Sequence, residues 1–217
     1  MTDWRSVTVT HAAARCALLC AIGLMLAASC GPAGAGEFAA GGLRFSDELG
    51  GFRIVAISGI GTKADPIILE EEIHDTAPVT LVIRRDPDVY DEAYPRISLA
   101  LTKIVQNRTG RVWGAFEMEL QEIRDKPSGD DDGLSFSQMD VQPPDVSSDR
   151  FANNHRRFKP HDRIRFLTGH VDPDDAVRFS VVITDPTPNA EFFLVQDPQF
   201  LFSDRRTKPG QAIFARR

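Results

Sequence analysis

The sequence predicts an all-β fold: an antiparallel β-sandwich of about 8–10 short strands, preceded by an N-terminal signal peptide helix. Three observations lead to this prediction. Apolar residues recur with period two from residue 52 onward, turn-forming residues separate these runs, and no window of a dozen residues holds a 3.6-residue apolar stripe. The 14 Pro and 16 Gly also favour many short elements. An α/β fold would need crossover helices, and the pattern indicates none.

The expected strands follow one another along the chain with turn signals between them. The clearest is 116–121, Phe-Glu-Met-Glu-Leu-Gln, because strict apolar/polar alternation is typical of a half-buried strand. In the run 97–104, Lys103 shares the parity of Ile97, Leu99 and Leu101. The run 68–73, with three glutamates, is interpreted as an edge strand. The remaining strand-like runs are 52–56, 79–83, 163–166, 177–183 and 192–195.

Two stretches show no regular pattern. Residues 125–132 are polar and acidic, and residues 139–162 form a long segment with Pro143-Pro144 and Asn153-Asn154. A loop of that length is uncommon in a compact domain unless it is functional or mobile. We therefore expect one sandwich domain over 43–203, followed by a basic tail over 204–217.

The first 35 residues have the pattern of an export signal. Arg5 and Arg15 supply positive charge, the run 16–28 is apolar, and small residues follow it. The run is too short for a spanning helix, which needs about 20 residues. The Gly/Ala-rich residues 36–42 are then expected to be a flexible tether.

Two cleavage points fit this leader, and both stay open. Cleavage after Ala35 would release a soluble protein that begins at Gly36. Alternatively, Leu26-Ala27-Ala28-Ser29-Cys30 resembles a lipoprotein box, in which Cys30 would be lipidated and become the first mature residue, anchoring the protein to a membrane. The two outcomes differ in the chemistry of the mature N-terminus.

Composition excludes several function classes. The formal net charge of −6 argues against nucleic-acid binding, which needs a concentrated basic surface. All three cysteines precede Gly31, so the expected domain has no internal disulfide, no cysteine-bound metal and no thiol nucleophile. Fourteen Phe against two Tyr and two Trp indicate aromatic residues that fill a core.

Residues 97–200 resemble a known family. Val105, Asn107, Thr109-Gly110, Trp113, Phe116 and Leu120 match a V-x-N-x-T-G-x-x-W-x-x-F-x-x-x-L pattern, and further short matches follow in order as far as Pro198. This pattern is similar to that of bacterial exported β-sandwich domains of the choice-of-anchor or PEP-CTERM type. The resemblance implies a β-sandwich in an exported protein, without established catalytic or ligand residues. The C-terminal sorting helix that such proteins often carry is missing, and residues 43–96 have no match of this kind.

Metal binding is one candidate chemistry. Aspartate oxygens suit calcium, and two acidic turns supply the candidates Asp130, Asp132, Asp172 and Asp174. Neither turn has the alternating ligands and closing glutamate of an EF-hand loop, so solvated turns are the alternative. His155, His161 and His170 lie near these acids, but their spacing matches no zinc motif. The sequence therefore predicts no cofactor, with calcium as the alternative.

Acid/base catalysis is a second candidate chemistry. Glu117, Glu119 and Glu122 could supply the two carboxyl groups that glycoside hydrolysis requires. A row of outward glutamates is also ordinary on a half-solvated sheet. The chain contains no Gly-x-Ser-x-Gly elbow for a serine nucleophile.

These observations predict an exported protein of a bacterial envelope, periplasmic or extracellular, with a non-catalytic structural or binding role. Its partner would be an envelope protein or a glycan, or the membrane itself through Cys30. A carbohydrate-active hydrolase and a calcium-dependent binding module are the alternatives. A catalytic constellation is not recognisable in the sequence.

Overall fold

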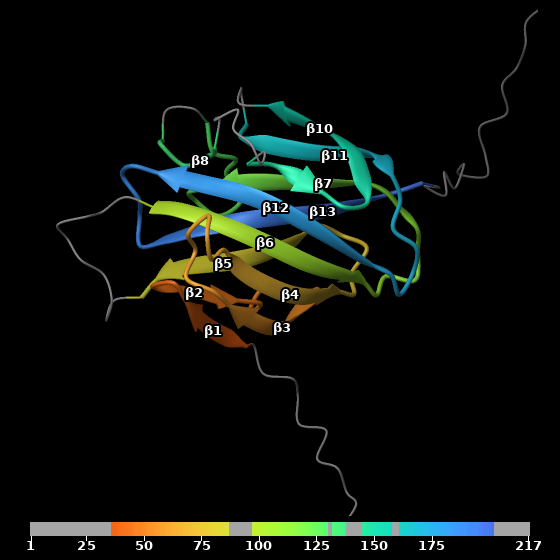
Figure 1. Cartoon of the computed structure of the whole chain (residues 1–217), viewed down its shortest axis with the longest axis horizontal. Coiled ribbons are helices and arrows are strands. Elements are labelled where there is room, and N and C mark those ends of the chain that lie inside the picture. The colour runs from red at the N-terminus through yellow and green to blue at the C-terminus, as the bar shows by residue number, and fades with distance from the viewer. Residues whose placement is uncertain (1–35, 87–96, 130–131, 138–144, 158–160, 202–217) are drawn as a thin grey trace, which may run out of the picture. The chain divides into compact units, whose positions relative to one another are not determined.

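The computed structural model describes residues 36–86, 97–129, 132–137, 145–157 and 161–201. These residues form strands and turns and contain no helix, which confirms the all-β prediction (Figure 1). None of them therefore belongs to a helix that could cross a membrane. The expected signal peptide, Ala35, Cys30 and the basic tail from residue 204 lie outside the described residues.

The strands are β1 (Glu37–Ala40), β2 (Leu43–Ser46), β3 (Phe52–Ser58), β4 (Ile67–Ile73), β5 (Val79–Arg85), β6 (Ile97–Asn107), β7 (Trp113–Gln121), β8 (Ser135–Phe136), β9 (Ser147–Ser148), β10 (Phe151–Arg157), β11 (Arg163–Gly169), β12 (Ala176–Asp185) and β13 (Glu191–Phe200).

The strands form two sheets. The seven-stranded sheet has the order β1-β2-β5-β13-β7-β11-β10, and the six-stranded sheet has the order β3-β4-β6-β12-β8, with β9 also paired to β12. All strand pairs are antiparallel except β4 and β6, which run parallel from Ile67 and Leu101 to Ile73 and Asn107. The prediction of a purely antiparallel fold is thus corrected. The parallel pair arises because the intervening strand, β5, belongs to the other sheet.

One hydrophobic core joins the two sheets. Phe116 of β7 lies against Phe179 of β12, with ring centroids 4.7 Å apart, and Trp113 lies 5.4 Å from Phe116. Both phenylalanines and the tryptophan are fully buried. Burying a large apolar side chain contributes about 1.5–3 kcal/mol, so these aromatic residues are a main source of the cohesion between the sheets.

The turn between β6 and β7 explains the Asn-x-Thr-Gly pattern. Asn107 is fully buried, and its Nδ2 donates hydrogen bonds to the carbonyl oxygens of Arg111 (2.7 Å), Val171 (3.1 Å) and Asp172 (3.2 Å). Its Oδ1 accepts hydrogen bonds from the backbone N–H and the hydroxyl of Thr109. The hydroxyl oxygen in turn accepts one from Trp113 Nε1 at 3.1 Å. The motif therefore forms a turn and positions a buried tryptophan through the hydroxyl of Thr109.

The expected tether over 36–42 is instead part of the sheet. Glu37–Ala40 forms β1, and Gly41 and Gly42, with φ of 58° and 75°, make the two-residue turn into β2. Glycine suits this turn because both central residues need positive φ. Gly41 and Gly42, which favour a flexible linker in the sequence, thus form the turn of a β-hairpin. The domain therefore begins before residue 43.

Two further expectations differ from the structure. The run 68–73 was expected at a sheet edge, but β4 lies between β3 and β6. The expected irregular segment 139–162 includes β10, which pairs with β11 at the edge of the seven-stranded sheet. The apolar/polar alternation that indicates a strand is weak in β10, since a strand at a sheet edge with one open face need not alternate strongly.

Candidate functional site

The outer face of the seven-stranded sheet carries two rows of residues across β13, β7, β11 and β10, and all of them are polar except Val195. They lie outside because their neighbours Phe116, Met118, Ile164 and Phe166 point into the core, and side chains alternate along a strand. Register places the residues of each row directly opposite one another on neighbouring strands. The first row is Asp197, Glu117, Arg165 and His155, and the second is Val195, Glu119, Arg163 and Arg157.

A hollow of about 210 Å³ opens on this face. It is lined by five of these residues, all from β7, β10 and β11: Glu117, His155, Arg157, Arg163 and Arg165. We call this site the outer-face hollow. Its position on ordered strands means that its shape is held by the sheet.

Arg163 occupies the acidic side of the hollow. Its Nη1 lies 2.9 Å from Glu117 Oε1, and its Nε donates to Glu119 Oε2 at 2.9 Å, while Nη2 also contacts Glu119 Oε2. Burial opposes the charge of Arg163, but the hydrogen bond and charge of Glu119, followed by Glu117, outweigh it and raise the pKa of Arg163. Glu117 and Glu119 therefore both contact the guanidinium group of Arg163.

Arg157 of β10 and Arg165 of β11 also line the hollow, Arg157 directly opposite Arg163 and Arg165 between Glu117 and His155. Both are exposed, and neither forms an ion pair or a side-chain hydrogen bond with any residue in the described part of the chain. His155, also exposed, lies directly across from Arg165. Among the five lining residues, three guanidinium groups face one carboxylate, that of Glu117, which leaves an excess of positive charge for an anion.

Asp197 of β13 lies directly opposite Glu117 in the sheet, outside the five residues that line the hollow. Burial raises its pKa, the charge of Glu117 on the neighbouring strand raises it further, and Arg163 and Arg165 offset part of this shift. A carboxyl whose protonated form is favoured next to a second carboxylate is an arrangement that acid/base chemistry uses. Glu122, which the sequence groups with Glu117 and Glu119, comes after β7, where burial, then Asp132 and Asp185, raise its pKa.

The predicted calcium ligands do not come together in the described residues. Asp132 Oδ1 accepts the backbone N–H of Leu134 at 3.2 Å, and Asp174 Oδ1 accepts Arg108 Nη1 at 2.6 Å. Asp172 Oδ2 lies 3.8 Å from Nε2 of His170. Asp130 is outside the described residues. Within the described ranges, no group of three or more His, Asp or Glu is placed to hold a metal ion, and the calcium module stays a prediction.

A polar cluster that the sequence pattern does not predict lies inside the core: Lys103, Glu71 and Gln196, which we call the core triad. Lys103 Nζ donates to Glu71 Oε2 at 2.7 Å, and Gln196 Nε2 donates to the same oxygen at 3.4 Å. A signal for it exists, because Lys103 shares the parity of Leu99 and Leu101 and so belongs on the buried face of its strand.

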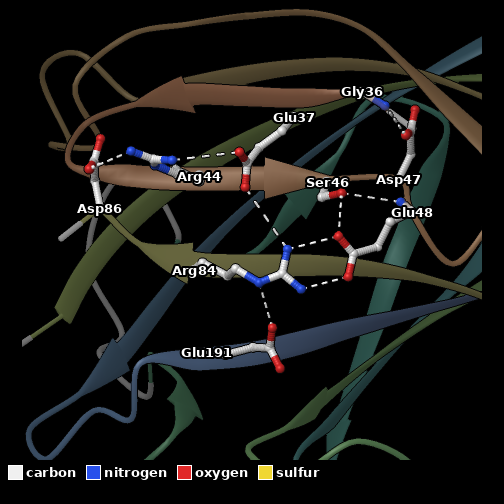
Figure 2. A network of polar contacts seen from close by, with 9 residues as sticks. All are labelled: Gly36, Glu37, Arg44, Ser46, Asp47, Glu48, Arg84, Asp86 and Glu191. Carbon is white, nitrogen blue, oxygen red and sulfur yellow. Dashed lines mark hydrogen bonds and ion pairs between the residues drawn. The ribbon is translucent and has the colours of Figure 1, made fainter. Parts of the chain in front are cut away.

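A second polar network connects β1, β5 and β13 of the seven-stranded sheet with Glu48, which follows β2 (Figure 2). Arg84 of β5 contacts Glu48, Glu191 and, at 4.0 Å, Glu37. Its positive charge is fully matched by these carboxylates. We therefore assign this network a structural role.

Comparisons with protein-family models, with curated proteins and with solved structures find no match for the chain. The functional proposal accordingly rests on the residues themselves.

Proposed function

We propose that the protein is an exported bacterial envelope protein, and that its two sheets form a non-catalytic β-sandwich module that binds an anionic group in the outer-face hollow. The leader over 1–35 and the resemblance over 97–200 support export. The lipidation of Cys30 and soluble release near Gly36 remain the two forms of this proposal.

The presence of both Arg157 and Arg165 in the lining of the hollow carries the proposal. Neither guanidinium group forms a salt bridge with a described residue, although the charge of Arg165 acts on Asp197, whereas Arg163 beside them contacts two glutamates. Guanidinium groups bind carboxylates and phosphates through paired N–H donors. The ligand class is therefore an anionic envelope polymer, and the hollow takes one of its carboxylate or phosphate groups.

A hydrolase is the second candidate, and one observation favours it. Asp197 and Glu117 are cross-strand partners, and the pKa of Asp197 is raised. Glu117, however, is bound to Arg163. Replacement Asp197→Asn separates the candidates, because a hydrolase would lose turnover of the polymer while a binding module would keep its affinity.

The experiment is a calorimetric titration of the full chain with polygalacturonate, which bears carboxylates, and with polyphosphate. Removing one charge-assisted contact costs about 1.5–3 kcal/mol, so the double change Arg157→Ala and Arg165→Ala weakens binding by at least about tenfold. Arg178→Ala is the control, since Arg178 is exposed on β12 of the other sheet. Binding of neither polymer, or equal losses in the double variant and the control, would overturn the proposal.

A further inference from the structure

The core triad joins the two sheets inside the hydrophobic core. Lys103 of β6 and Glu71 of β4 come from the six-stranded sheet, and Gln196 of β13 comes from the facing sheet. The side chains of Lys103 and Glu71 are 0% exposed, and Gln196 is also 0% exposed. One oxygen, Glu71 Oε2, accepts hydrogen bonds from both the amine of Lys103 and the carboxamide of Gln196.

The strand neighbours of the triad are apolar. Leu69 and Phe179 flank Lys103 on the adjoining strands, and Val79 and Met118 flank Gln196. A buried ion pair gains little net stability in such surroundings, since desolvation of the two charges offsets their attraction. Stability alone therefore gives no reason for placing a lysine and a glutamate here.

The triad also leaves two acceptors without a partner. Glu71 Oε1 and Gln196 Oε1 are buried and have no hydrogen bond. Buried oxygens of this kind are rare in native structures. If a proton moves from Lys103 to Glu71, the carboxyl gains a donor and the lysine becomes a neutral amine. Burial favours this form, because it lowers the pKa of Lys103, while the charge and hydrogen bond of Glu71 oppose the shift.

A neutral amine is a nucleophile, and a carboxamide carbon is an acyl group that an amine can attack. Because both nitrogens contact the same carboxylate oxygen, the two groups are neighbours, and one acid can carry protons between them. We propose that Lys103 and Gln196 form an intramolecular isopeptide bond, and that Glu71 is the catalytic residue that transfers the protons.

The reaction balances without an oxidant or a co-reactant. Lys103 Nζ first gives a proton to Glu71, and its lone pair then attacks Gln196 Cδ, forming the Nζ–Cδ bond. Glu71 passes that proton to Nε2, the Cδ–Nε2 bond breaks and ammonia leaves, and the new amide nitrogen then gives its extra proton back to Glu71. Of the three protons on the original ammonium group, one stays on the new amide, one leaves with ammonia and one remains on Glu71. The product removes both charges from the core.

The bond would supply a covalent link that cysteine cannot provide here. All cysteines of the chain lie at positions 16, 20 and 30, so the described residues contain none. The proposed bond connects β6 to β13 and hence one sheet to the other. This inference is independent of the anion-binding proposal, because the triad and the outer-face hollow share no residue.

Peptide mapping by mass spectrometry tests the inference on the full chain. The bond prevents tryptic cleavage after Lys103 and joins residues 97–108 to residues 179–205, with a mass about 17 Da below the sum of the two peptides, the mass of ammonia. Folded protein should give this branched peptide after prolonged incubation. Protein kept in denaturant from the start should give only linear peptides.

Three variants complete the test. Lys103→Met and Glu71→Gln should both abolish the branched peptide, and Glu72→Gln should retain it, because Glu72 is bound to Arg53 instead. Circular dichroism verifies that each variant is folded. Linear peptides alone from folded wild-type protein would overturn the inference regardless of how the variants fold. A branched peptide in folded Glu71→Gln would overturn the role of Glu71.

Discussion

Arg84 offers a quantitative test of how the seven-stranded sheet is held together (Figure 2). Its Nε donates to Glu191 Oε2 at 2.6 Å, and its two Nη atoms donate to the two oxygens of Glu48 at 2.8 and 2.6 Å. These contacts connect β5 to β13 and to the segment after β2. The hydrogen bond from Arg84, partly opposed by burial, lowers the pKa of Glu48 from 4.5 to about 2.

The size of the effect follows from this pKa. A fall from 4.5 to about 2 corresponds to at most about 3 kcal/mol. The Glu48 side chain is 37% exposed, so solvent screening reduces this contribution to about 1 kcal/mol. With the second contact to Glu191, we expect Arg84→Met to cost about 1–2 kcal/mol at neutral pH.

The pH dependence has a definite sign. The folded pKa of Glu48 lies below its unfolded value, so its contribution is fully present above pH 4.5 and disappears as the pH falls toward about 2. Urea denaturation measures the free energy of unfolding of wild type and Arg84→Met at neutral pH and near pH 2.5, and their difference should shrink by more than about half. Arg178→Met is the control. An equal loss at both pH values would refute the reasoning, since packing of the methylene stem would then account for the effect.

Further predictions concern the fold and the mature protein. Asn107→Ala should lower the free energy of unfolding by about 2–4 kcal/mol in urea denaturation, because three carbonyl groups lose their donor. Gly169→Ala should be at least as severe, since a Cβ there would lie 1.9 Å from the carbonyl oxygen of Arg150, and thermal melting would show it. Mass spectrometry of the mature protein should find either a diacylglyceryl group on Cys30 or a free N-terminus near Gly36. The melting temperature of the protein should be unchanged by added calcium or by a chelator. A rise of the melting temperature with calcium would instead support the calcium-dependent binding module.

Much of the strand content could be predicted from local pattern. The run 116–121 lies in β7 as expected, with Phe116, Met118 and Leu120 buried. Asn107 ends β6 and Trp113 enters the core, because Thr109 contacts both residues within the Asn-x-Thr-Gly turn, although Asn107 also donates to the distant carbonyl groups of Val171 and Asp172. Such features are accessible from the sequence since their causes are local.

Features that depend on distant pairing were not accessible. The parallel alignment of β4 with β6 requires β5 to leave for the other sheet, and no residue of β4 indicates this. The outer-face hollow likewise depends on register, which sets Arg165 opposite Glu117 and His155. From the sequence, His155 is a residue of an irregular segment, and only the pairing of β10 makes it part of a site.

The core triad shows what a polar residue at a buried position implies. Lys103, Glu71 and Gln196 each interrupt an apolar face of their own strand, and each alone would be costly, because an unpaired buried charge or amide loses its hydration without compensation. A sequence that folds with one such residue must therefore supply partners for it elsewhere. The three interruptions compensate one another only because β4 and β6 are adjacent and β13 faces them. Parity can thus indicate from sequence that a partner must exist, whereas the identity of that partner depends on the arrangement of the sheets.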